Sequence, residues 1–330
     1  MGAYLHHPAV NFPIRSEVGI ISDDIIKNFC SFTCGAIEEF RPILKLAQRY
    51  DTSFFFAYNP LRGLPLIRTG LLGAQNITCP LPTLLFWKFT GGLYYNLLSD
   101  ARFFQAFGAA FQNYVGEAIR RACPNPKFRL LPEQSYRLGK DRKDTVDWIF
   151  AGEEAAIFLE CKAKRLTWDA KVALDDLTPL SDDIDVLANA IVQTYKNIEE
   201  YQKGHYPHFA FDEDRRIYPI VVTLENWHLF GPVLLPMVHK AVEDMLADTG
   251  ISVAVLTEMP FAIWHVGELE RAFDIINAVG IRAFIDIKLD DSEMKDWQWS
   301  RYIAHTFGKR FPRRTLFSAE YDAIFARVRL

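Results

Sequence analysis

A short apolar hairpin that carries three charged side chains constrains this chain more than any other feature of its sequence. The stretch DTVDWIFAGEEAAIFLECKAKR, residues 144–165, contains two apolar runs around a Gly-Glu-Glu turn, the pattern of two antiparallel strands. Asp147 interrupts the first run, and Glu160 and Lys162 interrupt the second. Strands of such apolar composition are normally buried, and charged side chains are rarely buried without partners.

The position of the turn predicts which residues of the two strands face one another. With the turn centred between Glu153 and Glu154, antiparallel partners have residue numbers that sum to 307, so Asp147 lies opposite Glu160. Directly opposed residues point to the same face of the sheet, with Cβ atoms about 5 Å apart. Lys162, two residues after Glu160, points to that face as well. The three charges are therefore expected to converge.

Three converging charges in an apolar sheet favour a metal and phosphate site. Two neighbouring carboxylates repel each other and lose solvation, so each favours protonation. A hard divalent cation that prefers oxygen ligands, Mg²⁺ or Mn²⁺, removes this conflict. A lysine beside them can orient or deprotonate an attacking water, or stabilise negative charge on a phosphate. The alternative is an exposed cross-strand ion cluster, which would contribute little.

The spacing of these residues resembles that of the PD-(D/E)XK nuclease superfamily, which has the restriction-endonuclease-like fold. Asp147 precedes Glu160-Cys161-Lys162 by thirteen residues, and Val146 replaces the proline of the family's name. The resemblance implies an α/β fold with a mixed central β-sheet flanked by helices. It also implies a Mg²⁺-dependent (or Mn²⁺-dependent) hydrolase, most often a DNA endonuclease of restriction, repair or anti-phage defence.

The resemblance also implies further ligands and catalytic residues. The family often supplies another acid from the helix before the sheet, and Glu117 is the candidate here; the alternative is a solvated helix residue. Some relatives use a glutamine on the helix after the lysine strand, where Gln193 stands, although a surface glutamine is an equal alternative. The metal ligands would then be Asp147, Glu160, Glu117 and the backbone carbonyl of Cys161.

Two basic segments are candidates for nucleic-acid binding. The segment that leads into the hairpin and the end of its second strand carry Lys140, Arg142, Lys143 and Lys164. Residues 301–315 hold five Lys or Arg residues, no acid and three aromatics, among them the candidates Arg310, Arg313 and Arg314. Basic residues interleaved with aromatics suit a phosphate backbone and unstacked bases. An ordinary solvated face is the alternative reading.

The pattern of predicted elements and the family resemblance together imply three regions. Residues 1–98 are expected to be a mostly helical region for specificity, partner binding or dimerisation, 99–290 the nuclease-like domain, and 291–330 a basic and aromatic tail. Within the central region we expect helices over about 100–122, 184–203 and 233–247 and another after Gly267. Strands are expected around 128–138, in the hairpin, and in RIYPIVVTL, ISVAVLT and IRAFIDIKL.

Composition indicates where such a protein would act and how it would bind its substrate. Half of the 330 residues are hydrophobic, yet no run of about 18 apolar residues occurs, so no membrane span is expected. Five scattered cysteines are typical of reduced thiols and favour a cytoplasmic protein. The net charge of −4 means that any nucleic-acid binding must come from local patches.

A homodimer or partner subunit is expected if both DNA strands are cut. A catalytically silent nucleic-acid or protein-binding scaffold and an RNA-directed nuclease remain the alternative functions.

Overall fold

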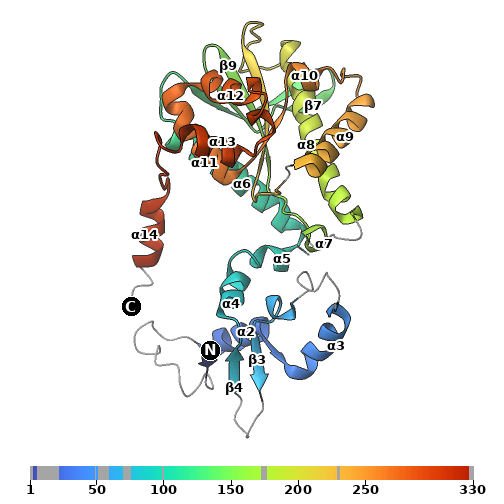
Figure 1. Ribbon diagram of the computed structural model, residues 1–330, viewed down its shortest axis with the longest axis vertical. Helices are drawn as coiled ribbons and strands as arrows, with labels where there is room; N and C mark the ends of the chain where they lie inside the picture. The colour runs from blue at the N-terminus through green and yellow to red at the C-terminus, as the bar shows by residue number, and fades with distance from the viewer. Residues whose placement is uncertain are drawn as a thin grey trace. The chain divides into compact units, whose positions relative to one another are not determined.

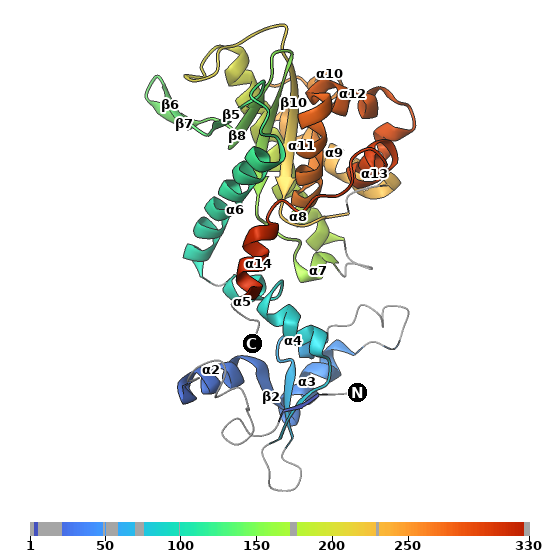
Figure 2. The ribbon, with the colours of Figure 1, turned by 90° about the vertical axis from the view of Figure 1, so that its left-hand side faces the viewer.

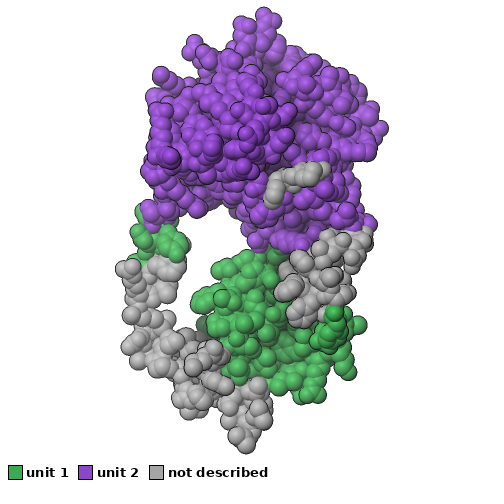
Figure 3. All heavy atoms as spheres, in the orientation of Figure 1, with its two compact units in different colours: residues 1–104, 319–330 green, residues 105–318 purple. Residues whose placement is uncertain are grey.

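A five-stranded mixed sheet organises the larger of two units of the chain. The computed structural model describes residues 3–5, 22–48, 50, 59–69, 76–98, 100–171, 177–228 and 231–326. It divides into Gln105–Ser318 and a second unit formed by Met1–Phe104 with Ala319–Leu330 (Figure 3). The five strands are, in sheet order, β11 (Ala262–His265), β10 (Arg216–Thr223), β9 (Ala155–Lys162), β8 (Trp148–Ala151) and β5 (Arg129–Pro132).

The predicted hairpin is confirmed, including its register. Trp148 pairs with Leu159 and Ile149 with Phe158, so the partner numbers sum to 307. β8 runs antiparallel to β9 and to β5, whereas β9, β10 and β11 are mutually parallel. β10 corresponds to the predicted strand RIYPIVVTL and is almost entirely buried, as expected for a strand covered on both faces.

Helices cover both faces of this sheet (Figures 1 and 2). One face packs against α8 (Thr178–Gln202) and α9 (Gly231–Ala247). The opposite face packs against α6, α11, α12 and α13; their bounds are Ala101–Ala122, Val266–Val279, Ile281–Asp290 and Trp299–Phe307. The predicted helices over 100–122, 184–203 and 233–247 and after Gly267 are therefore present, and the unit is a mixed α/β structure.

Two of the predicted strands are wrong. ISVAVLT contains turns and the short helix α10 (Val255–Glu258), and IRAFIDIKL forms α12. In α12 the buried side chains Ile281, Phe284, Ile285 and Lys288 recur at spacings of three and four, so they form one helical face against the core. Short apolar runs cannot be assigned to strand or helix by periodicity alone, and the fifth strand is the four-residue β11.

A second hairpin interrupts the antiparallel part of the sheet. β6 (Ser135–Leu138) and β7 (Asp141–Asp144) pair only with each other and form an arm, residues 135–144, beside β5 and β8 (Figure 2). Gly139 begins the connecting turn with φ at 63°, a conformation that glycine adopts without steric conflict. The segment predicted as part strand, part loop is thus an ordered two-stranded arm.

The unit that contains the N-terminal region has its own small sheet, which the sequence analysis missed. Its strands have three or four residues each, too short for a recognisable alternation. In sheet order they are β1 (Ala3–Leu5), β4 (Asn76–Cys79), β3 (Leu66–Thr69) and β2 (Cys34–Ala36). The helices of this unit are α2 (Asp23–Thr33), α3 (Ile37–Ala47), α4 (Pro82–Phe89), α5 (Leu93–Leu97) and most of α14 (Ser318–Ala326), with the 3₁₀ turn Pro60–Arg62.

The predicted tail over 291–330 is not a separate region. Residues up to Ser318 belong to the larger unit, where α13 buries Trp299, Tyr302, Ile303 and Phe307 in the core. The remaining short elements of this unit are α7 (Trp168–Lys171) and the 3₁₀ turn Met294–Asp296.

In the part of the chain that the structure describes, every helix is too short or too polar to cross a membrane.

One glycine fixes how closely α6 approaches the hairpin. A Cβ atom at Gly116 would overlap the indole ring of Trp148, whose Nε1 donates a 2.9 Å hydrogen bond to the backbone carbonyl of Gln112. Only a residue without a side chain therefore allows α6 to pack against the start of β8.

We predict that Gly116→Ala lowers the Tm of the larger unit by several degrees. Overpacked sites lose about 1–3 kcal/mol, and 1 kcal/mol is worth about 2–4 °C in a unit of this size. Gly108→Ala is the matched control, because it lies on the same helix with open space around its Cβ position; alanine should leave Tm unchanged or raise it. Calorimetry of both variants tests this, and equal Tm values would contradict the close α6 packing.

Candidate active site

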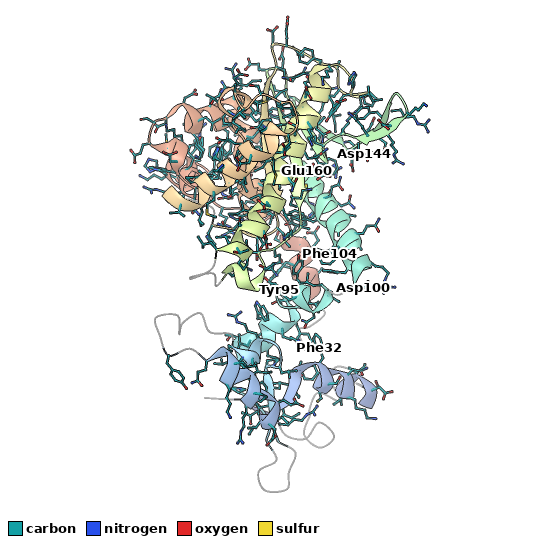
Figure 4. All side chains as sticks on the ribbon, turned by 90° about the vertical axis from the view of Figure 1, so that its right-hand side faces the viewer. Phe32, Tyr95, Asp100, Phe104, Asp144 and Glu160 are labelled. Atoms are coloured by element: carbon teal, nitrogen blue, oxygen red, sulfur yellow. The ribbon has the colours of Figure 1, made fainter. Side chains whose placement is uncertain are left out.

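The hairpin brings Asp147, Glu160 and Lys162 together as predicted. Asp147 directly precedes β8, and its Oδ2 accepts a hydrogen bond from the backbone N–H of Cys161 at 2.6 Å. Lys162 Nζ donates to Glu160 Oε1 at 2.8 Å. Glu160 is 12 % and Lys162 34 % exposed, so the cluster is partly open to solvent. Figure 4 shows Glu160 within the body of the unit, and Asp144 at the arm.

The electrostatics of the cluster favour the arrival of a positive charge. Burial first, and then the negative charges of Glu160 and Glu133, raise the pKa of Asp147 to about 7, against the opposing effects of the Cys161 N–H and Lys162. Burial alone would lower the pKa of Lys162, but Glu160 and Asp147 outweigh it, and the pKa is raised. Lys162 is therefore a stable ammonium at neutral pH, whereas Asp147 is partly protonated, because the neighbouring cationic charge does not offset burial and the two nearby acids.

A third acid, which the sequence analysis missed, extends this pair into a row. β5 pairs with β8 so that partner numbers sum to 280, and one residue further Glu133 faces Asp147. The N–H of Glu133 donates to the carbonyl of Asp147 at 2.9 Å. Its carboxylate accepts from Gln112 Nε2 of α6 at 3.2 Å. Glu133 just after β5, Asp147 just before β8 and Glu160 on β9 thus form a row across three neighbouring strands.

Glu117, the acid predicted from α6, is not brought to the hairpin. Its carboxylate pairs with Arg121 at 2.7 Å and Arg120 at 3.5 Å. The hydrogen bond from Arg121, followed by the charges of both arginines, lowers the pKa of this half-exposed group. Charged partners three and four residues away on the same helix face hold the side chain at the surface. The α6 side chain that reaches the row of acids is instead Gln112.

Gln193 also lies away from the acids. It is exposed on α8 and lines a hollow between that helix and the arm, together with Lys143, Lys196 and Glu200. Asp147, Glu160 and Lys162 do not line this hollow. Its position therefore supports the interpretation that Gln193 is a surface glutamine.

The residues present fit a magnesium ion that keeps much of its water. Within the described ranges, no three His, Cys, Asp or Glu side chains lie close enough to enclose a metal ion. Mg²⁺ is commonly held by only one or two carboxylates together with waters and substrate phosphates, and Asp147 and Glu160 meet that requirement. Burial raises the pKa of the Cys161 thiol well above its usual range, so its sulfur is a poor metal ligand; ligation by its carbonyl stays a prediction.

Two of the basic residues near the hairpin form ion pairs with acidic side chains. Lys164 Nζ lies 2.6 Å from Asp183, a buried carboxylate that also accepts hydrogen bonds from Thr167. Lys143 pairs with Glu200 at 3.0 Å. These two lysines therefore tie β7 and the end of β9 to α8, which makes them structural residues first.

Two other basic residues of the arm stay accessible. Lys140 is exposed at the turn, and Arg142 is 75 % exposed while its guanidinium donates to Ser135 at 2.8 Å. A phosphate backbone could meet both side chains without breaking a buried contact.

The aromatic part of the C-terminal prediction is wrong. Tyr302 and Phe307 are buried in the core, and Phe311 packs against it, so they cannot stack on bases. Arg310 lies over the Phe311 ring, and Arg314 pairs with Asp274 at 3.2 Å. Arg313 is exposed, and phosphate contacts by these arginines remain a prediction.

Comparison with known proteins adds no assignment. No family model, curated protein or solved structure matches this chain. The function must therefore be inferred from the geometry of the chain's own residues.

We predict that Asp147→Asn stabilises the metal-free protein at alkaline pH. Because the folded pKa of about 7 exceeds the unfolded value of about 3.9, the proton on Asp147 stabilises the fold. This contribution is present below about pH 4 and is lost as pH rises through 7. At pH 8 with a chelator, the variant should melt about 3 °C or more above wild type, and the difference should shrink towards pH 4.

Glu117→Gln is the matched control for this measurement. Its carboxylate is stabilised by Arg121 and Arg120, so its removal should give no gain in Tm. A Tm for Asp147→Asn equal to or below wild type at pH 8 would contradict a strained carboxylate at this position.

Proposed function

We propose that this protein is a metal-dependent nuclease of the PD-(D/E)XK type that acts on DNA as an endonuclease. The observation that carries the proposal is the meeting of Asp147, Glu160 and Lys162 on one hairpin. The order of elements supports it: α6, β5, the β8–β9 hairpin, α8, β10, α9 and β11 follow the helix, strand, hairpin, helix, strand, helix, strand order of the restriction-endonuclease-like fold.

Asp147 and Glu160 would hold the Mg²⁺ or Mn²⁺ ion. When bound, the ion would polarise a phosphate oxygen and favour ionisation of a water. The raised pKa of Asp147 supports this role, because a strained carboxylate in an accessible cluster is typical of functional sites. An ordinary structural ion pair would instead relieve the strain with an arginine or lysine bonded directly to Asp147.

Lys162 would stabilise charge rather than remove a proton. Its raised pKa keeps the ammonium protonated at neutral pH, which excludes it as a ready base in this state. A fixed ammonium beside the scissile phosphate stabilises the additional negative charge of the transition state. The 2.8 Å contact with Glu160 holds the ammonium at the acid pair.

Glu133 would act at the outer end of the row. It is exposed, and its carboxylate is oriented by Gln112, so it can accept a proton from a water or hold an outer-sphere water of the ion. Glu133 would thus be the additional acid at the site in place of Glu117, although it would contact the ion through water and not as a direct ligand.

The arm would bind the phosphate backbone next to this site. Lys140 and Arg142 are exposed on a two-stranded ribbon that is joined directly to β5 and β8. A single site cuts one strand, so cleavage of a duplex would require a homodimer or a partner subunit. RNA cleavage and a silent binding scaffold are the outcomes that the following assay distinguishes.

We predict Mg²⁺-dependent cleavage of plasmid and linear DNA that is lost with a chelator. Lys162→Ala should lower the rate by about 10²–10³, the usual effect of removing one transition-state contact, and Asp147→Asn should lower it at least as much. Lys240→Ala is the control, because this exposed lysine pairs only locally with Asp244 on α9. Cleavage of RNA alone would assign the RNA nuclease; DNA binding without cleavage under any metal would assign the scaffold.

We predict that the arm contributes a salt-dependent part of DNA binding. In an Asp147→Asn background, the double variant Lys140→Ala, Arg142→Ala should bind a duplex more weakly at low salt. Its slope of log affinity against log salt should be smaller by about 1–2, because each lost phosphate contact removes about one released counterion. Fluorescence anisotropy measures both quantities, with Lys240→Ala again as control. An unchanged slope would remove the arm from the binding surface.

A further inference from the structure

A polar hollow of about 480 Å³ lies between α8 and the arm. Its volume is within the usual range for ligand sites, but most such sites are lined mainly by apolar side chains. Here every lining residue except Ile251 has a polar or charged side chain. The composition of the lining therefore indicates a polar or charged ligand.

The hollow lies beside the candidate active site and is separate from it. Tyr136 of β6 lines the hollow, and its ring lies against that of Tyr206 with centroids 5.9 Å apart. The hydroxyl of Tyr206 accepts the N–H of Val146 at 3.4 Å, one residue before Asp147. Both tyrosines are buried, so two packed rings stand between the hollow and the acid pair.

Asn197 brings an unpaired amide to the wall of the hollow. Its side chain is only 5 % exposed, lines the hollow, and forms no hydrogen bond with any residue that the structure describes. By contrast, the buried Thr194, on the same helix, donates to the carbonyl of Ala190. Buried polar groups almost always have partners. Because neither amide atom of Asn197 is fully enclosed by protein, a ligand in the hollow can supply the missing partner.

The charges around the hollow leave one cation uncompensated. Its three acids already have basic partners: Asp144 lies 3.9 Å from Arg142, Glu199 lies 3.0 Å from Lys203, and Glu200 lies 3.0 Å from Lys143 and 2.9 Å from His205. Lys196 also lines the hollow and is exposed. Within the described ranges it has no acidic partner. The surplus is therefore one positive charge.

A phosphodiester group matches this lining. It carries a single negative charge, and its free oxygens accept hydrogen bonds from lysine, arginine and asparagine side chains in nucleic-acid complexes. Arg142, one of the proposed backbone contacts of the arm, lines the hollow too. A backbone that runs along the arm would therefore arrive at Lys196 and Asn197.

We infer that the hollow binds one backbone phosphodiester of a nucleic acid, whose charge Lys196 neutralises and whose oxygen accepts a hydrogen bond from Asn197. The inference rests on the proposed function for the identity of the polymer. Binding at the hollow requires neither a metal ion nor catalysis.

Fluorescence anisotropy with a duplex oligonucleotide in a chelator tests the inference, in an Asp147→Asn background. Lys196→Ala should raise the Kd about three- to tenfold at low salt and lower the slope of log affinity against log salt by about 1. Asn197→Asp keeps the shape of the side chain but places a carboxylate against the phosphate, so it should raise the Kd at least about tenfold.

Two matched variants control for charge alone. Asn189→Asp adds the same charge to an exposed position of α8, where the amide donates only to the carbonyl of Asp185. Lys240→Ala removes a lysine that pairs locally on α9. Both should change the Kd less than about twofold. Thermal melting checks the fold of each variant, and Lys196→Ala, at an exposed position, keeps the test valid if Asn197→Asp unfolds.

A second series identifies the group that the hollow binds. A single uncharged methylphosphonate is placed in turn at each position of the oligonucleotide. At one position it should weaken binding about as much as Lys196→Ala does, and the two changes together should have no additional effect. If no position couples to Lys196 in this way, the hollow does not bind a phosphodiester.

The inference and the proposed function fail separately. An unchanged Kd and salt slope for Lys196→Ala, or the absence of any nucleic-acid binding, overturns the phosphodiester site, whatever the cleavage assay gives. Coupling between Lys196 and one methylphosphonate position supports the site even if no cleavage is found with any metal.

Discussion

The close approach of two half-buried carboxylates on one hairpin is the constraint on which the rest of this account depends. The β8–β9 register forces Asp147 against Glu160, and burial raises the pKa of Asp147 to about 7. The sheet that imposes this conflict is held by apolar contacts on both faces, so the strands cannot separate to relieve it. Perturbed carboxylates of this kind are typical of functional sites, and we propose that a divalent metal ion, which suits two oxygen ligands, relieves the conflict here.

The hairpin was predictable because its information is local. The centre of the turn and the two-residue alternation of strand side chains were enough to predict that the three charged residues Asp147, Glu160 and Lys162 lie on one face of the hairpin. Glu133 could not be found this way, because its place opposite Asp147 depends on the pairing of β5 with β8 across the whole β6–β7 arm. Glu117 was misplaced for the opposite reason: Arg120 and Arg121, its neighbours on α6, compete for its carboxylate.

The other errors arose where short segments fit two structures. IRAFIDIKL has β-forming residues, yet Ile281, Phe284, Ile285 and Lys288 form a buried helical face. Tyr302 and Phe307 stood among basic residues and suggested base stacking, but their contact with the core determines their role.

The central claim is that Asp147 and Glu160 share a divalent ion. Anomalous diffraction from crystals soaked in Mn²⁺ tests it most directly. The account predicts one Mn²⁺ ion bonded to both carboxylates, with the Lys162 ammonium beside it and the remaining ligands mainly waters. Crystals in which Mn²⁺ binds elsewhere, while Asp147 keeps its contact with the Cys161 N–H and Glu160 its pair with Lys162, would contradict the claim.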